Sequence, residues 1–191
     1  GSETLAVAII SFCQYWFMLK VAAKRGPHLG VDRMTLQIDD AGVGDLLSGV
    51  VVGVYRPETG EFSYDMIGVE FFQPPKFSKK AYLRKASEIL TKIIDKMKPL
   101  ENEPILICSS FILESAARDL QERYGNERVT ISKITDEAQR LVETAYLDEL
   151  RNLGYEPVDE REEKRARSFF HMLHWIKTVS YTHLRAHETV L

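Results

Sequence analysis

Cysteine is scarce in this chain, which has only two among its 191 residues, Cys13 and Cys108. Small secreted domains that depend on disulfides have several closely spaced cysteines, whereas these two are far apart and lie in apolar surroundings. We therefore expect two reduced, buried thiols in a cytoplasmic protein.

An excess of either charge is also missing, because 25 Lys and Arg stand against 28 Asp and Glu, a formal net charge of -3. This balance excludes a broadly basic surface. It is compatible with a local nucleic-acid groove, which needs clustered Lys and Arg rather than a positive total. The chain has no low-complexity segment and no internal repeat, and 45% of its residues are hydrophobic. We expect one domain with one sizeable core, plus extensions.

Several catalytic signatures are absent as well. The sequence GVGDLLSG at residues 42–49 lacks the Gly-Lys-Ser/Thr of a P-loop and the spacing of a dinucleotide fingerprint. Ser109 and Ser110 have no Gly-x-Ser-x-Gly elbow, and the only histidines in residues 34–177 are His171 and His174. Because a serine nucleophile needs a partner base, this pattern disfavours a serine hydrolase.

Residues 1–33 are interpreted as an extension that precedes the domain. The chain begins with Gly1, and Met34 stands just before the first credible strand, so translated upstream sequence is one explanation. The alternatives are a helix that packs on the domain and a membrane anchor. The apolar run at residues 5–19 is shorter than the about 20 residues of a spanning helix, and Glu3 stands where a signal peptide has basic residues. We expect no membrane segment in the domain itself.

The C-terminal residues 179–189, VSYTHLRAHET, resemble one reading frame of a transposase-type sequencing adapter. We therefore expect residues 178–191 to be an adapter-derived scar and the domain to be truncated after Lys177. His174, His183 and His187 would otherwise suggest a metal site. The scar interpretation argues against that site.

The most informative stretch is residues 34–72, which has the composition of three consecutive antiparallel strands. The expected strands cover residues 35–40, 49–56 and 61–72. The second is a Val-rich run of the kind buried on both faces of a sheet. The first delivers Asp39 and Asp40 to its own end, directly before a loop in which Gly42 and Gly44 allow positive φ and close approach of a ligand.

From residue 82 onward the apolar period changes to 3.6 residues, which predicts helices alternating with short strands. The expected helices cover residues 82–97, 114–124, 136–153 and 159–177, and the expected strands cover 104–108 and 129–134. Ser78 is a candidate cap for the first helix, and Gly125 and Gly154 follow the next two. The predicted order is βββαβαβα.

The sequence from Ile38 to Gly44, Ile-Asp-Asp-Ala-Gly-Val-Gly, resembles the opening of type 2 ribonuclease H, in which Asp-Glu-Ala-Gly is followed by Arg-Gly. Phe77-Ser78-Lys79-Lys80 is similar to the Asp-Ser-Lys segment of that family. The resemblance implies a ribonuclease H-like α/β domain over residues 34–177, with a βββαβαβα core and a mixed five-stranded sheet flanked by helices. It also implies that the end of the fourth strand lies beside Asp39 and Asp40.

Enzymes of this superfamily hold divalent ions between carboxylates from the first and fourth strands and from a later helix. The resemblance therefore implies a Mg²⁺ or Mn²⁺ site at Asp39 and Asp40, completed by Glu143 or Glu137, in an enzyme that cleaves nucleic acid or transfers phosphoryl groups. The remaining candidate binding residues are Gly42, Gly44, Lys79, Lys80, Ser109 and Ser110.

This chain departs from the family pattern at three positions. The fourth strand ends in Cys108 without an acid, Val43 replaces the Arg of the opening motif, and Phe77 replaces the Asp of the lysine segment. Two alternatives therefore stay open: a non-catalytic binding or assembly module of the same fold, and a nucleotide-phosphate binder. In these alternatives Asp39 and Asp40 terminate a strand and shape its turn.

The helical acids also have a structural alternative. Glu143 flanks the apolar stripe of its helix, whereas Glu149 falls near the centre of the stripe and would be costly to bury without a partner. For both acids, a helix-surface position or a structural ion pair is favoured over a role in the site.

Overall fold

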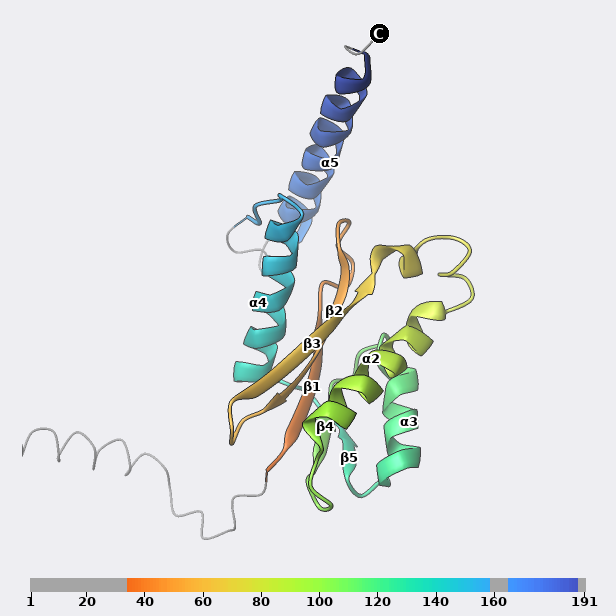
Figure 1. Cartoon of the computed structure of the whole chain (residues 1–191), viewed down its shortest axis with the longest axis vertical. Helices are drawn as coiled ribbons and strands as arrows, with labels where there is room; N and C mark the ends of the chain where they lie inside the picture. Colours follow the sequence, from red (N-terminus) through yellow and green to blue (C-terminus); the bar gives the residue numbers. More distant parts are fainter. Residues whose placement is uncertain (1–33, 159–164, 189–191) are drawn as a thin grey trace, which may run out of the picture. The chain divides into compact units, whose positions relative to one another are not determined.

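The computed structural model describes residues 34–158 and 165–188, which build an α/β domain on one five-stranded sheet (Figure 1). The strands are β1 Leu36–Ala41, β2 Gly49–Arg56, β3 Glu61–Gly68, β4 Ile105–Ile107 and β5 Val129–Ile131. The helices are the 3-10 helix η1 Val69–Phe72 and the α-helices α2 Ala81–Met97, α3 Glu114–Tyr124, α4 Asp136–Asn152 and α5 Arg165–Glu188. The predicted α/β class and the order βββαβαβα are confirmed.

The sheet is mixed and has the strand order β3-β2-β1-β4-β5. β1 pairs antiparallel with β2 and parallel with β4, whose Ile107 is the partner of Ile38. The backbone N–H of Cys108 donates to the carbonyl of Ile38 at 2.9 Å and so extends this pairing by one residue. This order is consistent with the ribonuclease H-like topology, and it brings the end of β4 to the end of β1.

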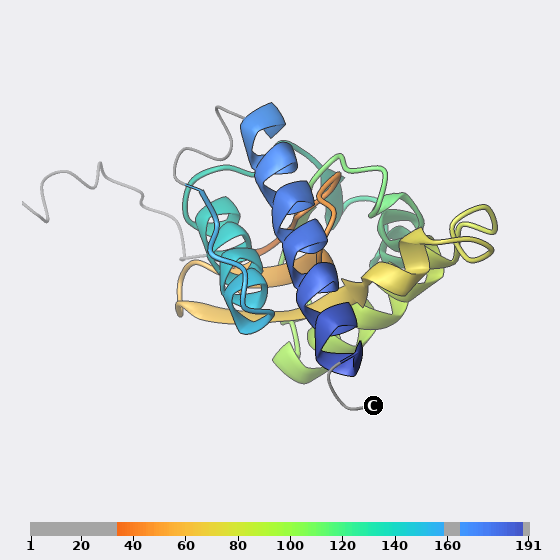
Figure 2. The same ribbon diagram turned by 90° about the horizontal axis from the view of Figure 1, so that it is seen from above.

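Helices cover both faces of the sheet (Figures 1 and 2). α2 and α3 pack on one face and α4 packs on the other, so the domain has two buried apolar clusters. Val50, Val52 and Val54 of β2 belong to the cluster under α2 and α3, whereas Val51 belongs to the cluster under α4. The uninterrupted valine run is therefore explained by burial on both faces.

Gly53 of β2 allows α4 to approach the sheet closely. A Cβ atom at this position would lie 2.5 Å from Cγ1 of Val142, so a larger residue would push the helix away. The buried residues of α4 are Ala138, Val142, Ala145, Tyr146 and Leu150. Leu153 lies past the end of the helix and is exposed.

The helix expected at residues 82–97 was predicted by seven apolar residues at a period of 3.6, and all seven are buried in α2. Its buried residues are Tyr82, Ala86, Ile89, Leu90, Ile93, Ile94 and Met97. The predicted cap is wrong, because the residue before the helix is Lys80 in a left-handed conformation and the Ser78 hydroxyl donates to the carbonyl of Pro75 at 2.9 Å.

Three strands are shorter than predicted, among them β4, which covers Ile105–Ile107 instead of residues 104–108. β3 ends at Gly68, whose partner is Gly49, the first residue of β2, so no strand remains for residues 69–72 to pair with. These residues form η1 instead, and Phe71 and Phe72 pack against the cluster under α2. β5 ends at Ile131 because its neighbour β4 offers only three residues for pairing.

α5 belongs to the same structural unit as the sheet, a unit that begins at Met34. Met172 is buried in the cluster under α4, and Nδ1 of His171 shares a hydrogen bond of 2.7 Å with the hydroxyl of Tyr155. The helix was predicted to begin at residue 159, but residues 159–164 lie outside the described residues, as does the apolar run at residues 5–19. α5 continues past Lys177 to Glu188. No helix in the described part of the chain is long and apolar enough to cross a membrane.

Candidate metal centre

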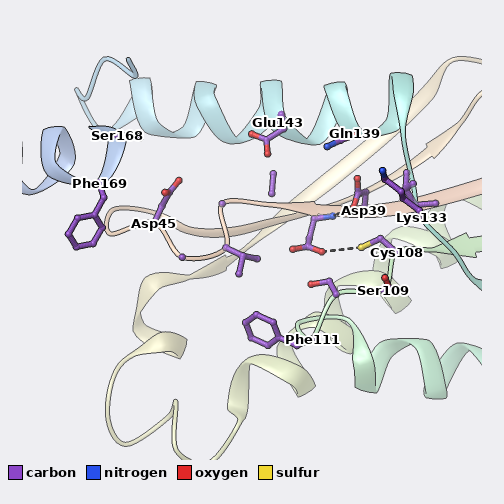
Figure 3. A pocket seen from close by; sticks show the side chains of 17 residues that line it. Asp39, Asp45, Cys108, Ser109, Phe111, Lys133, Gln139, Glu143, Ser168 and Phe169 are labelled. Atoms are coloured by element: carbon purple, nitrogen blue, oxygen red, sulfur yellow. Dashed lines mark hydrogen bonds between the residues drawn. The ribbon is translucent and has the colours of Figure 1, made fainter. Parts of the chain in front are cut away.

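An open cleft of about 1020 Å³ lies where β1 and β4 end (Figure 3). Its walls come from the loop after β1, from the loop after β4 that carries Cys108 to Phe111, and from α4 and α5. Residues from distant parts of the sequence therefore meet at one edge of the sheet, as expected where parallel neighbouring strands end.

Asp39 and Asp40 stand on opposite faces of β1, because side chains alternate along a strand. Asp39 shares its face with Ala41, which packs under α4, and Asp40 shares its face with Ile38, which packs under α2 and α3. Near the edge of the sheet the two carboxylates still approach each other. Single ligand atoms of Asp39, Asp40 and Cys108 all lie within 4.8 Å of one another.

The two carboxylates are partly desolvated. Burial raises the pKa of Asp39, and the neighbouring charge of Asp40 raises it further. Hydrogen bonds from Cys108 and from the backbone N–H of Asp40 partly offset this increase. The N–H of Asp40 lies 2.9 Å from Oδ1 of Asp39. Burial also raises the pKa of Asp40, against hydrogen bonds from Cys108 and Ser110 that lower it. The fold therefore disfavours the charged form of both acids, which a bound cation would offset.

Cys108 has no disulfide partner within the described residues. Its Sγ atom donates a hydrogen bond to Oδ1 of Asp40 at 3.1 Å. Burial raises the pKa of this thiol strongly, and the charges of Asp40 and Asp39 raise it further. The thiol is therefore protonated at neutral pH and acts as a neutral donor. Cys108 is partly buried and Cys13 lies outside the described residues, so the reduced state of the two thiols stays a prediction.

Of the two helical acids proposed to complete the site, Glu143 lines the cleft and Glu137 does not. Glu143 lies on α4 and points toward the loop after β1 (Figure 3). Glu137 is exposed, forms an ion pair with Arg140, and lines a smaller, separate pocket. That ion pair lowers the pKa of Glu137, so its charge already has a partner.

Glu149 is not the buried acid that its place in the stripe suggested. Its carboxylate is half-buried and accepts a hydrogen bond of 3.1 Å from the hydroxyl of Tyr64 on β3. Glu149 does not line the cleft.

The glycine loop has the conformation that the sequence indicated. Gly42 has a φ of +96° and Gly44 a φ of +88°, both in the region that L side chains rarely adopt. Both glycines line the cleft. A Cβ atom on Gly42 would lie 2.3 Å from Cε2 of Tyr146, so the loop also packs directly on α4.

The remaining binding candidates divide into two groups. Ser109 and Ser110 line the cleft, and the Ser110 hydroxyl also accepts a hydrogen bond from the N–H of Ile112 at 3.3 Å. Lys79 and Lys80 are exposed before α2 and do not line the cleft. A lysine of another segment, Lys133, lines it instead.

Sequence reasoning missed Cys108 as a member of the site. The parallel pairing of β1 with β4 was a usable signal, because the fourth strand was expected to end beside Asp39 and Asp40. A thiol at the strand end does not match the acid of the family pattern, so the resemblance points away from Cys108. The other unforeseen lining residues include Asp45, Phe111, Lys133, Ile134, Gln139, Ser168 and Phe169. No short-range pattern marks them, because they come from separate elements.

The donor set fits a divalent ion held by two carboxylates. Carboxylate oxygens are the ligands that Mg²⁺ and Mn²⁺ prefer, whereas a sulfur ligand suits softer ions. The identity of the ion therefore stays a prediction. Comparison of the chain with protein-family models, with curated proteins and with solved structures finds no match.

Proposed function

We propose that the protein is a divalent-metal-dependent nuclease or a related phosphoryl-transfer enzyme that acts on nucleic acid. The observation that supports this proposal is the closeness of Asp39, Asp40 and Cys108, whose ligand atoms gather within 4.8 Å at an open cleft. Glu143 stands on the α4 wall of the same cleft and supplies a further carboxylate.

In this proposal each residue has a defined task. Asp39 and Asp40 hold the ion, and Cys108 and Ser110 orient the Asp40 carboxylate through hydrogen bonds. When bound, divalent ions activate water and stabilise the leaving oxygen in phosphoryl transfer. Lys133 is the cationic side chain of the cleft lining and pairs with a phosphate of the substrate.

A second candidate is a non-catalytic module of the same fold, and the Cys108 thiol favours it. A neutral thiol stands at the end of β4, where the enzymes that this chain resembles place an acid. With only two carboxylates in the closest cluster, the site holds a cation more weakly, and nucleic acid or a protein binds without one.

Cleavage assays on the full chain separate the two candidates. RNA–DNA hybrid, branched DNA and single strands are incubated with Mn²⁺, with Mg²⁺ and with chelator. The enzyme proposal requires metal-dependent cleavage that Asp39→Asn and Asp40→Asn each reduce at least a hundredfold. No cleavage of any substrate, or cleavage undiminished in both variants, would contradict it.

The helical acids provide a matched comparison in the same assay. Glu143→Gln should reduce cleavage because Glu143 lines the cleft, and Glu137→Gln should leave it unchanged because Glu137 is paired with Arg140 outside it. Equal effects of the two variants would remove the proposed role of Glu143.

A further inference from the structure

Four aromatic rings form a continuous cluster beside the cleft, which we call the aromatic platform: Phe72, Phe77, Tyr82 and Phe111. Tyr82 is its centre. The ring centroid of Tyr82 lies 5.5 Å from that of Phe72 and 5.6 Å from that of Phe77, both stacked, and 6.1 Å from that of Phe111, edge to face. The platform therefore joins η1, the segment before α2, α2 itself and the loop after β4.

Two of the three outer rings of the platform face solvent. Phe77 is 49% exposed and Phe111 is 54% exposed, whereas Tyr82 is buried beneath them. Phe77 and Phe111 therefore expose apolar area to water, which is unfavourable as long as nothing covers the two rings. A flat apolar ligand would cover that area.

The segment that carries Phe72, Phe77 and Tyr82 is rich in cations, with Glu70 and Glu88 just outside it and Lys85 paired with Glu88. Residues 71–87 contain no Asp or Glu, and their five cations are Lys76, Lys79, Lys80, Arg84 and Lys85. This concentration is unusual in a chain whose formal net charge is -3. Lys79 and Lys80 are exposed, and the ammonium of Lys76 lies 4.5 Å from the ring centroid of Phe71. The exposed lysines that lie next to Phe77 in the sequence, Lys76, Lys79 and Lys80, thus suit a polyanion.

We propose that the aromatic platform binds an unpaired segment of nucleic acid. Phe77 and Phe111 stack against its bases, and Lys79 and Lys80 pair with its phosphates. Exposed aromatic rings flanked by cations are the arrangement that binds single strands, because every base has a face that stacks and every nucleotide carries a phosphate. A duplex keeps its bases stacked on one another and offers the rings nothing.

The platform adjoins the cleft through Phe111, which belongs to both (Figure 3). A strand whose base stacks on Phe111 therefore has its next phosphates at the rim that carries Ser109 and Ser110. The choice of ligand rests on the proposed function of the cleft. The binding itself does not, because none of the platform residues belongs to the carboxylate cluster.

The test is fluorescence anisotropy with the full chain in chelator, so that cleavage does not interfere. The probes are a labelled 12-nucleotide single strand, the duplex of the same sequence, and an abasic strand of the same length that keeps the phosphates. The single strand should bind at least tenfold more tightly than the abasic strand and the duplex, since two bases stack and each base on an aromatic ring changes affinity by at least about fivefold.

Variants assign the binding to the platform. Phe77→Leu and Phe111→Leu keep an apolar side chain but lose the ring, and they should abolish the preference for the intact strand over the abasic strand. Phe77→Trp keeps a ring and should retain this preference. Lys79→Gln with Lys80→Gln should reduce the slope of log affinity against log salt by about 1.4, or 0.7 per lost phosphate contact. Leu100→Ala and Lys92→Gln are the matched controls, because both positions are exposed elsewhere and should have no effect.

Four results would contradict the proposed binding of a single strand. Two concern the bases: equal affinity for the intact and abasic strands, or an unchanged preference for the intact strand in Phe77→Leu and Phe111→Leu. The other two are equally effective competition by polyglutamate of the same charge, and platform variants whose only effect is to separate a dimer into monomers. Asp39→Asn distinguishes the two proposals. If it abolishes cleavage and keeps strand binding, both hold. If strand binding persists in a protein that never cleaves, only the proposed enzyme is lost.

Discussion

Sγ of Cys108 lies 3.1 Å from Oδ1 of Asp40, so a neutral thiol occupies the position from which a third acid would complete the carboxylate cluster. Cys108→Asp should therefore raise the affinity for Mg²⁺ and Mn²⁺ at least tenfold, because carboxylate oxygen is their preferred ligand. Without metal the variant should melt at a lower temperature, since three carboxylates repel one another. Calorimetric titration and thermal melts measure the two effects. Cys108→Ser is the control, and its metal affinity should stay close to that of the parent.

Addition of Mn²⁺ should stabilise the fold. An ion at a hundred times its Kd adds about 2.7 kcal/mol to the free energy of unfolding, which is a rise of about 5 to 10 °C in Tm for a domain of this size. Chelator should reverse the rise, and Asp39→Asn with Asp40→Asn should remove it. Asp119→Asn, an exposed acid on α3, should keep it. A Tm that does not respond to Mn²⁺ would count against the metal centre.

In the metal-free protein, Asp39 and Asp40 should contribute less to stability at neutral pH than at a pH of about 4, where both are protonated. Burial raises the pKa of both Asp39 and Asp40, so between the ordinary carboxyl pKa of about 4 and the raised folded values the native state binds more protons than the unfolded state. The free energy of unfolding contributed by these groups therefore falls as pH rises through that window. Asp39→Asn with Asp40→Asn should remove this loss and raise the Tm at pH 7.

Urea unfolding between pH 4 and 8 checks the sign. The difference in unfolding free energy between the double variant and the parent should grow with pH and then level off. A difference that is constant across the range would mean that the two acids titrate normally.

Arg56 and Glu103 form a buried, two-pronged ion pair that ties the end of β2 to the turn before β4. Arg56 is 6% exposed and Glu103 is 2% exposed, and their paired atoms lie 2.7 Å (Nε to Oε1) and 3.1 Å (Nη2 to Oε2) apart. Glu103→Gln should cost about 1.5 to 3 kcal/mol in unfolding free energy, because it removes the buried partner of the Arg56 guanidinium and leaves only the pair with the half-exposed Glu61. Glu137→Gln, in an exposed pair, should leave Tm unchanged. Comparable losses in the two variants would show that burial of the first pair has no effect.

Gly42 and Gly44 separate two costs of adding a methyl group. Gly44→Ala adds only backbone strain, about 1 to 2 kcal/mol, because nothing lies within 4 Å of the new Cβ. Gly42→Ala adds the same strain and also places Cβ 2.3 Å from the ring of Tyr146 and 2.8 Å from the carbonyl oxygen of Gly49. We expect it to cost clearly more in urea unfolding. Equal costs would mean that the loop moves away from α4 freely.

The sequence by itself determined the elements and their burial. The valine run of β2, the seven-residue stripe of α2 and the change of period after residue 81 each arise within one segment, where periodicity fixes which side chains share a face. The position of Asp39 and Asp40 at the end of a strand followed from the same local pattern.

The contacts between segments far apart in the chain were decided only by the tertiary structure. β3 stops at Gly68 because its partner β2 begins at Gly49, and Cys108 reaches Asp40 because β4 lies parallel to β1 in one particular register. Glu137 and Glu143 looked alike in sequence, and the direction in which α4 crosses the sheet brings only Glu143 into the cleft. The sequence does not state these distances, because pairing register and helix docking depend on contacts between residues far apart in the chain.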